Sequence, residues 1–472
     1  MDWNFFTLMK SELSLTVLIF IFLFAKIGNL AENNRKFLMF ANIMLVLNFA
    51  FGFFWNGTGV LFSGMFVTHS IIGLEKNILN LALMLVSFLS YDWLSKNKNA
   101  SEFYMLLLSS QLGMFFMLSS GNFLMFFLAM ELSTIPLAAL SNFDLDRPKS
   151  SEAAFKLIMS SAFASCIMLF GLSLLYGTTG TLDFSEMRGL ITMSHLQVMA
   201  FVFVFVGLAF KLSLVPFHLW TADVYEGSPV SITATLAVIS KGAFIFVFMS
   251  TLFIAFGPMI AVWEKMIMLS IMVTITIGNF MAVRQSNLKR LLAFSSISQV
   301  GYLLMGIVCG FTPEGASSVI YFMLIYVLSS LAMFAVVAVV FNQTGKEEVN
   351  DYRGFYQNNK LLSWVVAIAL FSLAGIPPTA GFFGKYFLLA AGAGKGDYIL
   401  LGVVILNMVV SLYYYLRVIR AIFIDKGDGP SEKVTVSPMV ATSIIICVAG
   451  VLCIGFAGDI FEYVHSHFYM EH

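Results

Sequence analysis

Charged residues are scarce in this chain: they make up 11% of its 472 residues, against about 25% in soluble globular domains. The 26 basic and 26 acidic residues balance, so the formal net charge is zero. The chain therefore has no overall field of one sign that would favour nucleic acid or an acidic substrate as a partner. The scarcity of charge instead indicates a chain whose main surroundings are lipid rather than water.

Cysteine is also rare. The four cysteines, Cys166, Cys309, Cys447 and Cys453, stand singly in apolar runs, without a C-x-x-C pair or a histidine at metal-ligand spacing. We expect small core residues here, not metal ligands or disulfide partners. No sequence motif for NADH, flavin or an iron–sulfur cluster is present. The N-terminus lacks a basic flank and an A-x-A site, so the first apolar segment is expected to stay as a helix.

Hydrophobic residues make up 59% of the chain and gather into fourteen apolar stretches of about 20 residues, the length with which a helix crosses a membrane. Backbone polar groups inside lipid need internal partners, and the alternation of a barrel is absent, so we expect helices. The stretches begin near residues 12, 36, 66, 102, 121, 152, 198, 228, 261, 288, 316, 361, 397 and 436. The predicted fold is an all-α polytopic membrane protein.

Lysine and arginine are distributed unevenly between alternate loops, 16 on one side against three on the other. The larger set contains Arg35, Lys36, Lys96, Lys98, Arg147, Lys149, Arg284, Lys289, Arg290, Lys346, Arg353, Lys360, Arg417, Arg420, Lys426 and Lys433, and the smaller set contains Lys10, Arg188 and Lys395. The positive-inside rule places the larger set in the cytoplasm. Both termini then lie on the other face, which agrees with an even number of helices.

Two segments are interrupted by proline at corresponding places of the two halves: residues 210–216 end at Pro216, and residues 375–385 contain Pro377 and Pro378. A proline leaves a helical carbonyl without its donor, which is tolerated at membrane depth only where protein or water replaces it. Paired broken helices indicate a transporter with inverted repeats. The alternative is that the prolines only kink packed helices, but a lysine accompanies each interruption.

Four charged residues lie well inside apolar segments: Glu131, Lys211, Lys241 and Lys385. A charge there costs about 2.5 to 3.5 kcal/mol on insertion scales, so each is a functional hypothesis. Burial favours the neutral form of a lysine and a nearby carboxylate favours the charged form, which suits a proton relay. Glu131 is the only carboxylate that the pattern places deep in a helix, with Lys211 as its expected partner. The alternative is a static ion pair, which leaves two lysines uncompensated.

Polar side chains accompany these charges. Ser295, Gln299 and Tyr302 follow the i, i+4, i+7 spacing of one helix face, and His218 lies seven residues after Lys211, which predicts the same stripe. Either set can hold water for proton transfer or make ordinary interhelical hydrogen bonds.

Two further pairs of charges are close in sequence. Lys156 follows Glu152 at i, i+4 spacing, so it can pair with that residue or accept protons on the cytoplasmic side. Glu75 and Lys76 are adjacent and point in different directions, and the pattern gives neither a role.

Three runs resemble signatures of the antiporter-like subunits of respiratory complex I, the proton-pumping NADH:quinone oxidoreductase, and of its subunit N branch in particular. They are FKLSLVPFHLWTADVYEGSP at residues 210–229, RLLAFSSISQVGYL at residues 290–303, and SLAGIPPTAGFFGK at residues 372–385. The resemblance spans roughly residues 121–415. Two positions depart from the family: Ala222 stands where proline is usual, and Gln299 where many members have histidine. Glutamine can orient water but cannot exchange a proton.

The resemblance implies fourteen helices with two inverted five-helix repeats. The expected divisions are residues 1–101 for helices 1–3, 102–255 for the first repeat, 256–425 for the second, and 426–472 for the last helix. It also implies that Glu131, Lys211, Lys241 and Lys385 carry protons, with Lys156, His218, Ser295, Gln299 and Tyr302 as a supporting path.

The implied function is proton translocation by a membrane subunit of a bacterial inner-membrane complex, with both termini in the periplasm. NADH, FMN, iron–sulfur clusters and quinone are implied on partner subunits, with no cofactor on this chain. The alternatives are an Mrp-type cation/proton antiporter subunit and a purely structural membrane anchor.

Overall fold

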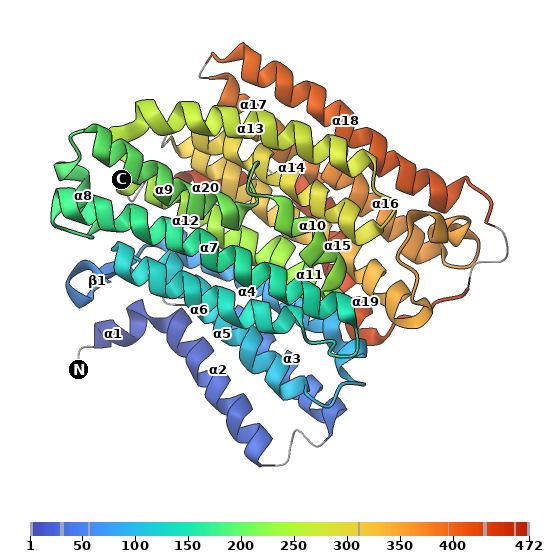
Figure 1. Ribbon diagram of the computed structural model, residues 1–472. Coiled ribbons are helices and arrows are strands. Elements are labelled where there is room, and N and C mark those ends of the chain that lie inside the picture. Colours follow the sequence, from blue (N-terminus) through green and yellow to red (C-terminus); the bar gives the residue numbers. More distant parts are fainter. Residues whose placement is uncertain are drawn as a thin grey trace.

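The computed structural model describes residues 3–28, 33–54, 57–309, 312–394, 396–427, 432–456 and 459–469. Helices account for nearly all of this part of the chain, and they lie side by side as a bundle (Figure 1). The N-terminal helices form one edge of the bundle in this view, and the late helix α18 (Tyr398–Phe423) forms the other. The predicted fold class is confirmed.

The N-terminal unit contains three long helices. It consists of α1 (Trp3–Leu8), α2 (Lys10–Ile27), α3 (Asn34–Phe51), the antiparallel strands β1 (Gly59–Leu61) and β2 (Phe66–Thr68) with the 3-10 turn η2 (Phe62–Gly64) between them, and α4 (Ser70–Leu94). The strand β2 connects this unit to the following helices, because Val67 donates its backbone N–H to Ser119 O at 2.8 Å.

Five transmembrane crossings follow. They consist of α5 (Ala100–Leu118), α6 (Phe123–Ser141), α7 (Pro148–Thr179), the surface helix α8 (Phe184–Leu190), the interrupted pair α9 (His195–Leu212) and α10 (Leu219–Gly227), and the continuous run of α11 (Val230–Ala234), the π-helix η3 (Thr235–Ser240) and α12 (Lys241–Ile254). The next five contain a second interrupted pair. They consist of η4 (Gly257–Met259) with α13 (Ile260–Val283), α14 (Leu288–Val308), α15 (Pro313–Thr344), the turns η5 (Val349–Tyr352) and η6 (Phe355–Gln357), α16 (Lys360–Ala374) with α17 (Ala380–Ala393), and α18.

The chain ends with α19 (Pro438–Phe456) and the short helix α20 (Asp459–Tyr469). Each of the fourteen predicted segments coincides with a helix or an interrupted pair of helices. Eleven of the described helices are long and apolar enough to cross a membrane, and α16 and α17 are shorter apolar helices. The helix α2 falls outside the eleven although it has 18 residues, because it carries Lys10, Glu12 and Lys26.

Both predicted interruptions are present, and the first begins earlier than Pro216 suggests. The helix α9 ends at Leu212 and Ser213 adopts a left-handed conformation with φ 61°, so the chain leaves the helix three residues before the proline. In the second, α16 ends at Ala374, and the next residue, Gly375, has φ 83°, a value that favours glycine. The peptide bonds before Pro216 and Pro378 are cis.

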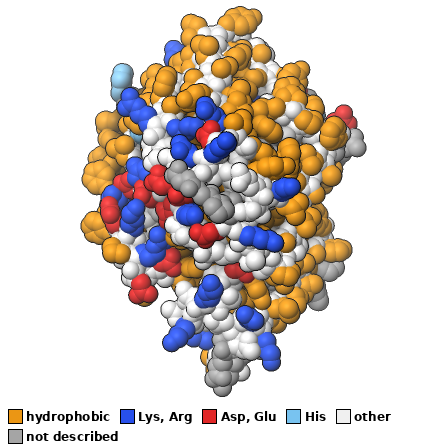
Figure 2. Space-filling model, turned by 90° about the vertical axis from the view of Figure 1, so that its right-hand side faces the viewer, with side chains coloured by type: hydrophobic (Ala, Val, Ile, Leu, Met, Phe, Trp, Pro, Cys, Tyr) orange, Lys and Arg blue, Asp and Glu red, His pale blue; other side chains and the backbone are white. Residues whose placement is uncertain are grey.

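One end of the bundle carries most of the basic residues, and we call it the basic face. It contains the described loops between α2 and α3, α4 and α5, α6 and α7, α13 and α14, α15 and α16, and α18 and α19. Figure 2 looks at this end and shows Lys, Arg, Asp and Glu side chains gathered on it, with hydrophobic side chains along the flanks. We call the other end the opposite face; Lys395, predicted there, lies outside the described residues.

The centre of the bundle is formed by α14, nearly all of whose residues are buried, and α15, most of whose residues are buried. The expectation that all four cysteines are core residues is wrong: Cys447 is buried, but Cys166 and Cys453 are exposed and Cys309 is intermediate. Isolated cysteines in apolar runs are therefore compatible with a side that faces lipid as well as with the core.

Candidate functional site

Lys211 lies in the last turn of α9, directly before the chain breaks. Its side chain is 7% exposed, and Nζ donates to Thr134 Oγ1 on α6 and to Ser161 Oγ on α7, both at 2.7 Å. The ring of Phe244 lies 5.9 Å from the same ammonium. The lysine is thus held by neutral hydroxyl groups from two neighbouring helices.

Glu131 does not contact Lys211, although it was the expected partner. Among the described residues, the carboxylate has no ion pair within 4.0 Å; it accepts a hydrogen bond from Ser165 Oγ at 2.5 Å and is partly exposed on α6. Its charge still acts on Lys211 across the gap between α6 and α9. The two groups are close enough to interact electrostatically, but the lysine is free of a direct carboxylate contact.

Lys241 begins α12 directly after the π-helix η3. A π-helical turn has wider hydrogen bonding than an α-helix and is frequent at functional sites. The side chain of Lys241 is 2% exposed; Nζ donates to Ser296 Oγ on α14 at 2.7 Å and lies 5.5 Å from the ring of Tyr225. A second lysine is thus held by a neutral oxygen.

His218 does not follow the stripe of Lys211. The helix ends at Leu212, so the seven-residue spacing does not cross a continuous helix, and His218 instead precedes the first turn of α10. It is 7% exposed, its Nδ1 has no hydrogen-bond partner among the described residues, and the charge of Lys241 acts on it. The structure places this imidazole between the two halves of the interrupted helix, within electrostatic range of the second lysine.

Lys385 lies in the first turns of α17 and reaches back to the end of α16. It is 2% exposed, and Nζ donates to the carbonyl oxygens of Leu373 at 2.7 Å and Ala374 at 3.3 Å. Carbonyl groups in the last turn of a helix have no intrahelical donor, so the break provides these acceptors. The ring of Tyr302 lies 4.6 Å from the ammonium.

A hydrogen-bonded row connects the surroundings of Lys385 to α14 and α18. Tyr415 OH lies 2.5 Å from Ser295 Oγ and accepts a bond from Gln299 Nε2 at 3.1 Å. Gln299 also donates to Leu373 O at 2.9 Å, the oxygen that Lys385 uses. Of the three residues predicted on one face, Ser295 and Gln299 meet at Tyr415, which the sequence does not point to. The third, Tyr302, instead accepts a hydrogen bond from Asn279 Nδ2 at 3.3 Å.

Ion pairs gather where α7, α10 and α14 meet at the basic face. Lys156 Nζ contacts Glu152 Oε1 at 2.7 Å, as its spacing suggested, and Asp223 Oδ2 at 2.6 Å. Arg290 binds Asp223 at 2.7 Å and Glu226 at 2.9 Å. Asp223, Glu226 and Arg290 were missed as site residues, although Asp223 and Glu226 share one face of α10 by their i, i+3 spacing.

Lys289 was counted among the loop lysines, but it is fully buried at the start of α14. Its Nζ donates to Glu226 O at 2.6 Å and lies 3.6 Å from Glu347 Oε1. The prediction that Glu131 is the only deep carboxylate is wrong. Two other carboxylates are more deeply buried, because Glu12 is 1% and Glu75 5% exposed. Glu12 lies near a helix start, where periodicity does not distinguish a buried from a solvated carboxylate.

The part of the chain that the structure describes contains no group of three or more His, Cys, Asp or Glu residues that could hold a metal ion. The site residues described above are lysines, carboxylates, one arginine, one histidine and uncharged polar side chains.

Comparisons with known proteins support this reading of the fold. The family model described as NADH:quinone oxidoreductase/Mrp antiporter, TM, matches residues 120–411. The structure also resembles a chain of respiratory complex I from Thermus thermophilus, with a TM-score of 0.78 and 26% identity over 94% of this chain and 96% of that one. A chain of the Mrp complex from Dietzia sp. DQ12-45-1b gives a TM-score of 0.86 at 19% identity over 97% and 96%, which shows a shared fold alone.

Relatives by sequence are more specific. The chain is 42% identical to NADH-quinone oxidoreductase subunit N of Phocaeicola vulgatus, over 96% of this chain and 97% of the relative. It is 43% identical to the protein of the same name from Azobacteroides pseudotrichonymphae, over 99% and 98%. The chain belongs to the NADH:quinone oxidoreductase/Mrp antiporter family of membrane proteins, and within it to the NADH-quinone oxidoreductase subunit N group.

Proposed function

We propose that this chain translocates protons as a membrane subunit of NADH-quinone oxidoreductase, and that Lys211, Lys241 and Lys385 carry the protons with Glu131. The observation that carries the proposal is common to the three lysines. Each is at most 7% exposed, lies at or beside an irregular part of a helix, and donates to hydroxyl or carbonyl oxygens instead of a carboxylate.

An ammonium held by neutral oxygens inside a membrane is costly, so its proton is retained or released according to small changes nearby. Glu131 supplies such a change: if its carboxylate approaches Lys211, the charged lysine is favoured, and if it withdraws, the neutral one is. His218 and the row of Ser295, Gln299 and Tyr415 provide polar groups between the lysines. In this scheme the proton moves and the helices remain in place.

The two interrupted pairs support a division into two repeats of five crossings. We assign residues 102–255, which begin within the first turn of α5 and include α12, to the first repeat and residues 256–425, with α13–α18, to the second, and leave residues 1–101 and 426–472 outside the repeats. The broken crossing is the fourth of each set, and the two sets start from opposite faces. The basic face is the cytoplasmic one, which places both termini in the periplasm of a bacterial inner membrane.

The partners are the other membrane subunits of the same complex, and the neighbours by structure include chains of respiratory complex I. The chemistry that drives translocation is carried out on partner subunits, which hold NADH, FMN, iron–sulfur clusters and quinone. This assignment separates the chain from an Mrp-type antiporter subunit, which has no redox partner, and from a structural anchor, which does not move protons.

The test substitutes the lysines one at a time by methionine in the intact complex. We expect proton uptake by inverted membrane vesicles to fall at least about tenfold for Lys241→Met, since a positioned proton-transfer group contributes about 100-fold or more. Lys265→Met, which removes an exposed lysine of α13, is the control and should pump like the wild type. Full pumping by Lys241→Met in assembled complex contradicts the proposal, and a complex without flavin and iron–sulfur subunits supports the antiporter instead.

A further inference from the structure

The N-terminal unit contains a buried ion pair that lies apart from Lys211, Lys241 and Lys385, which we call the lysine row. Lys76 Nζ on α4 lies 2.5 Å from Glu12 Oε1 on α2, and the two side chains are 2% and 1% exposed. The same ammonium donates to Ser119 Oγ at the end of α5 at 2.6 Å. Three helices therefore bring one lysine, one glutamate and one hydroxyl together near the opposite face.

The surroundings of the pair are apolar apart from a few charges. The rings of Phe66 and Phe115 lie 5.3 Å and 5.9 Å from Lys76 Nζ. Lys10, which donates to Gly52 O and Phe54 O, is close enough for its charge to interact with Lys76. Burial among aromatic rings makes the ionised pair costly, because two charges have been taken out of water.

The second oxygen of the Glu12 carboxylate takes no part in the ion pair. Glu12 Oε2 is buried and has no hydrogen-bond partner within the described ranges. A purely structural ion pair gains nothing from such an atom, because an unsatisfied buried acceptor is unfavourable. A carboxylate that receives a proton on one oxygen and passes one on from the other needs a second oxygen available.

Glu75, the charged residue beside Lys76, lies on the side of α4 that faces the middle of the molecule. Consecutive residues of a helix point about 100° apart, so Glu75 faces away from Glu12. Glu75 lies one turn before Leu79, whose Cδ2 is 3.3 Å from the position of a Cβ on Gly242, the residue after Lys241. The helix α4 thus carries Glu75 on the side that faces α12, and Lys76 on the side that faces α2 and α5.

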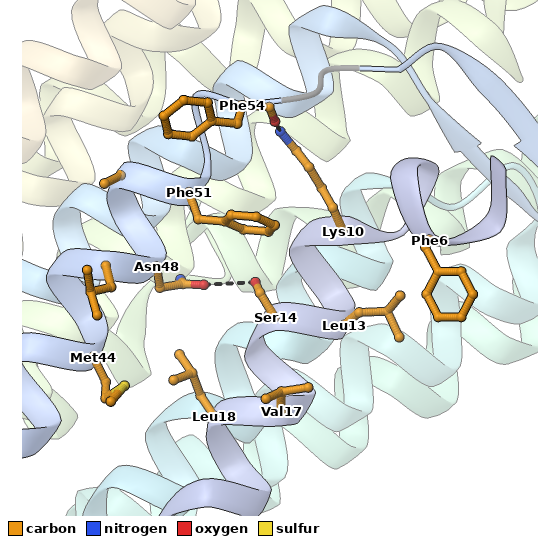
Figure 3. Close-up of a pocket in the computed structure, with 12 residues that line it drawn as sticks. Phe6, Lys10, Leu13, Ser14, Val17, Leu18, Met44, Asn48, Phe51 and Phe54 are labelled. Atoms are coloured by element: carbon orange, nitrogen blue, oxygen red, sulfur yellow. Dashed lines mark hydrogen bonds between the residues drawn. The ribbon is translucent and has the colours of Figure 1, made fainter. Parts of the chain in front are cut away.

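A polar route also leads outward from the pair. Asn80, one turn after Lys76, accepts from Asn48 Nδ2 at 3.0 Å, and Asn48 Oδ1 accepts from Ser14 at 2.8 Å. Ser14, Asn48 and Lys10 line a groove of about 650 Å³ between α2 and α3 (Figure 3), whose other lining residues are apolar. The hydrogen-bonded side chains therefore run from the groove to the helix turn that follows the pair.

We propose that Lys76 and Glu12 form an additional proton-transfer pair, on the opposite-face side of the lysine row. In the step, one N–H bond of the Lys76 ammonium breaks and an O–H bond forms at Glu12, which turns the ion pair into an amine and a carboxylic acid without changing the net charge. Release of that proton leaves a carboxylate, and a proton arriving by way of Glu75 recharges the amine. The inference rests on the proposed function, since it extends the same translocation.

The experiment uses the intact complex and two variants. Glu12→Gln with Lys76→Met removes both charges together and keeps similar side-chain volumes. Lys76→Arg keeps the ion pair but stays protonated. The matched control is Lys26→Met with Glu102→Gln, because this exposed pair, 2.5 Å apart, joins α2 to α5 at their other ends. Lys241→Met is measured beside them.

At equal amounts of assembled complex, we expect proton uptake to fall at least about tenfold in both Lys76 variants and to stay unchanged in the control. If the double variant does not assemble, the pumping rate of Lys76→Arg alone decides between a proton-transfer pair and a packing contact. Wild-type pumping by Lys76→Arg, or by the assembled double variant, overturns the inference and leaves the pair as a packing contact. If the Lys76 variants pump like the wild type but Lys241→Met does not, the proposed function stands and only this inference fails. Wild-type pumping by Lys241→Met overturns the proposed function itself.

Discussion

Lys211 and Glu131 interact through their charges without touching, which leads to a specific expectation for their substitution. Glu131→Gln and Lys211→Met should each abolish most proton pumping, and the double substitution should not restore it, because no titratable group is regained. Their effects on assembly should be nearly independent, with an interaction energy below about 1 kcal/mol, whereas breaking a buried contacting pair costs about 3–5 kcal/mol. A double-mutant cycle measures both quantities, on native gels and in vesicles.

The matched control for this cycle is Lys26→Met with Glu102→Gln, an ion pair in direct contact but exposed. It should leave pumping unchanged. Wild-type pumping by the Glu131/Lys211 double variant would remove both residues from the proton path. A large interaction energy in assembly would instead mean that the two side chains meet in the intact complex.

Tyr415 allows a test that removes a single hydroxyl group. In Tyr415→Phe the ring stays and the bonds to Ser295 and Gln299 are lost, so we expect stability to fall by about 1 kcal/mol and pumping to decrease. Tyr413→Phe removes a hydroxyl from a 61% exposed side chain of the same helix and should behave like the wild type. Thermal unfolding in detergent and proton uptake give the two readouts; equal pumping by both variants would exclude Tyr415 from the path.

At the scale of residues, the sequence identified the lysines but not their contacts. An isolated lysine in an apolar run is conspicuous, because its cost in lipid demands an explanation. The pattern of one helix does not say which other helix it faces, so the acceptors Ser296 and Leu373 O could not be foreseen. His218 was misplaced for a related reason, since a face of a helix is defined only while the helix continues.

Among the helices, the break between α16 and α17 depends on one glycine. A Cβ on Gly381 would lie 1.8 Å from Ser372 O and 2.6 Å from Ser372 C, both backbone atoms. Gly381→Ala must therefore push α17 away from the end of α16, at a cost of at least about 1–3 kcal/mol. It also moves Lys385 from its carbonyl acceptors, so pumping should fall with stability.

Gly402 on α18 provides the comparison, because a Cβ there meets nothing within 4 Å. Gly402→Ala should be neutral or stabilise the protein by up to about 1 kcal/mol, since alanine favours a helix. The midpoint of thermal unfolding of the assembled complex distinguishes the two substitutions. Equal midpoints would mean that α17 can move away from the end of α16 without lowering the stability of the complex.

Helix positions were the most predictable part of the fold. Runs of about 20 apolar residues located the fourteen crossings, and the start of α14 at Leu288 agrees with the expected residue. The π-helix η3 was not foreseen, because its sequence is as apolar as that of an ordinary helix. Deep charges in α2 and α4 were not foreseen either, since charges close to a helix end are usually solvated or reach the membrane surface.

For the molecule as a whole, the orientation in the membrane is a prediction that labelling can check. In a cysteine-free background, a membrane-impermeant maleimide added to intact cells should label a cysteine at Ser185, which is exposed on the opposite face, but not one at Lys36 on the basic face. Inverted vesicles should give the reverse result. Labelling of Lys36→Cys in intact cells would reverse the orientation of both termini.

The central position of α15 has a consequence for how this protein can change over time. Most residues of α15 are buried, whereas most residues of α18, at the outer edge, are not. The helix α15 contacts α4, α14, α16, α17 and α19. A substitution in α15 must be accepted by several neighbours at once, whereas many positions of α18 are exposed on the outside of the bundle. Random mutagenesis followed by selection for respiration should therefore recover varied residues along α18 and few along α15, so that residues at the centre of the bundle should change more slowly than those at its edge.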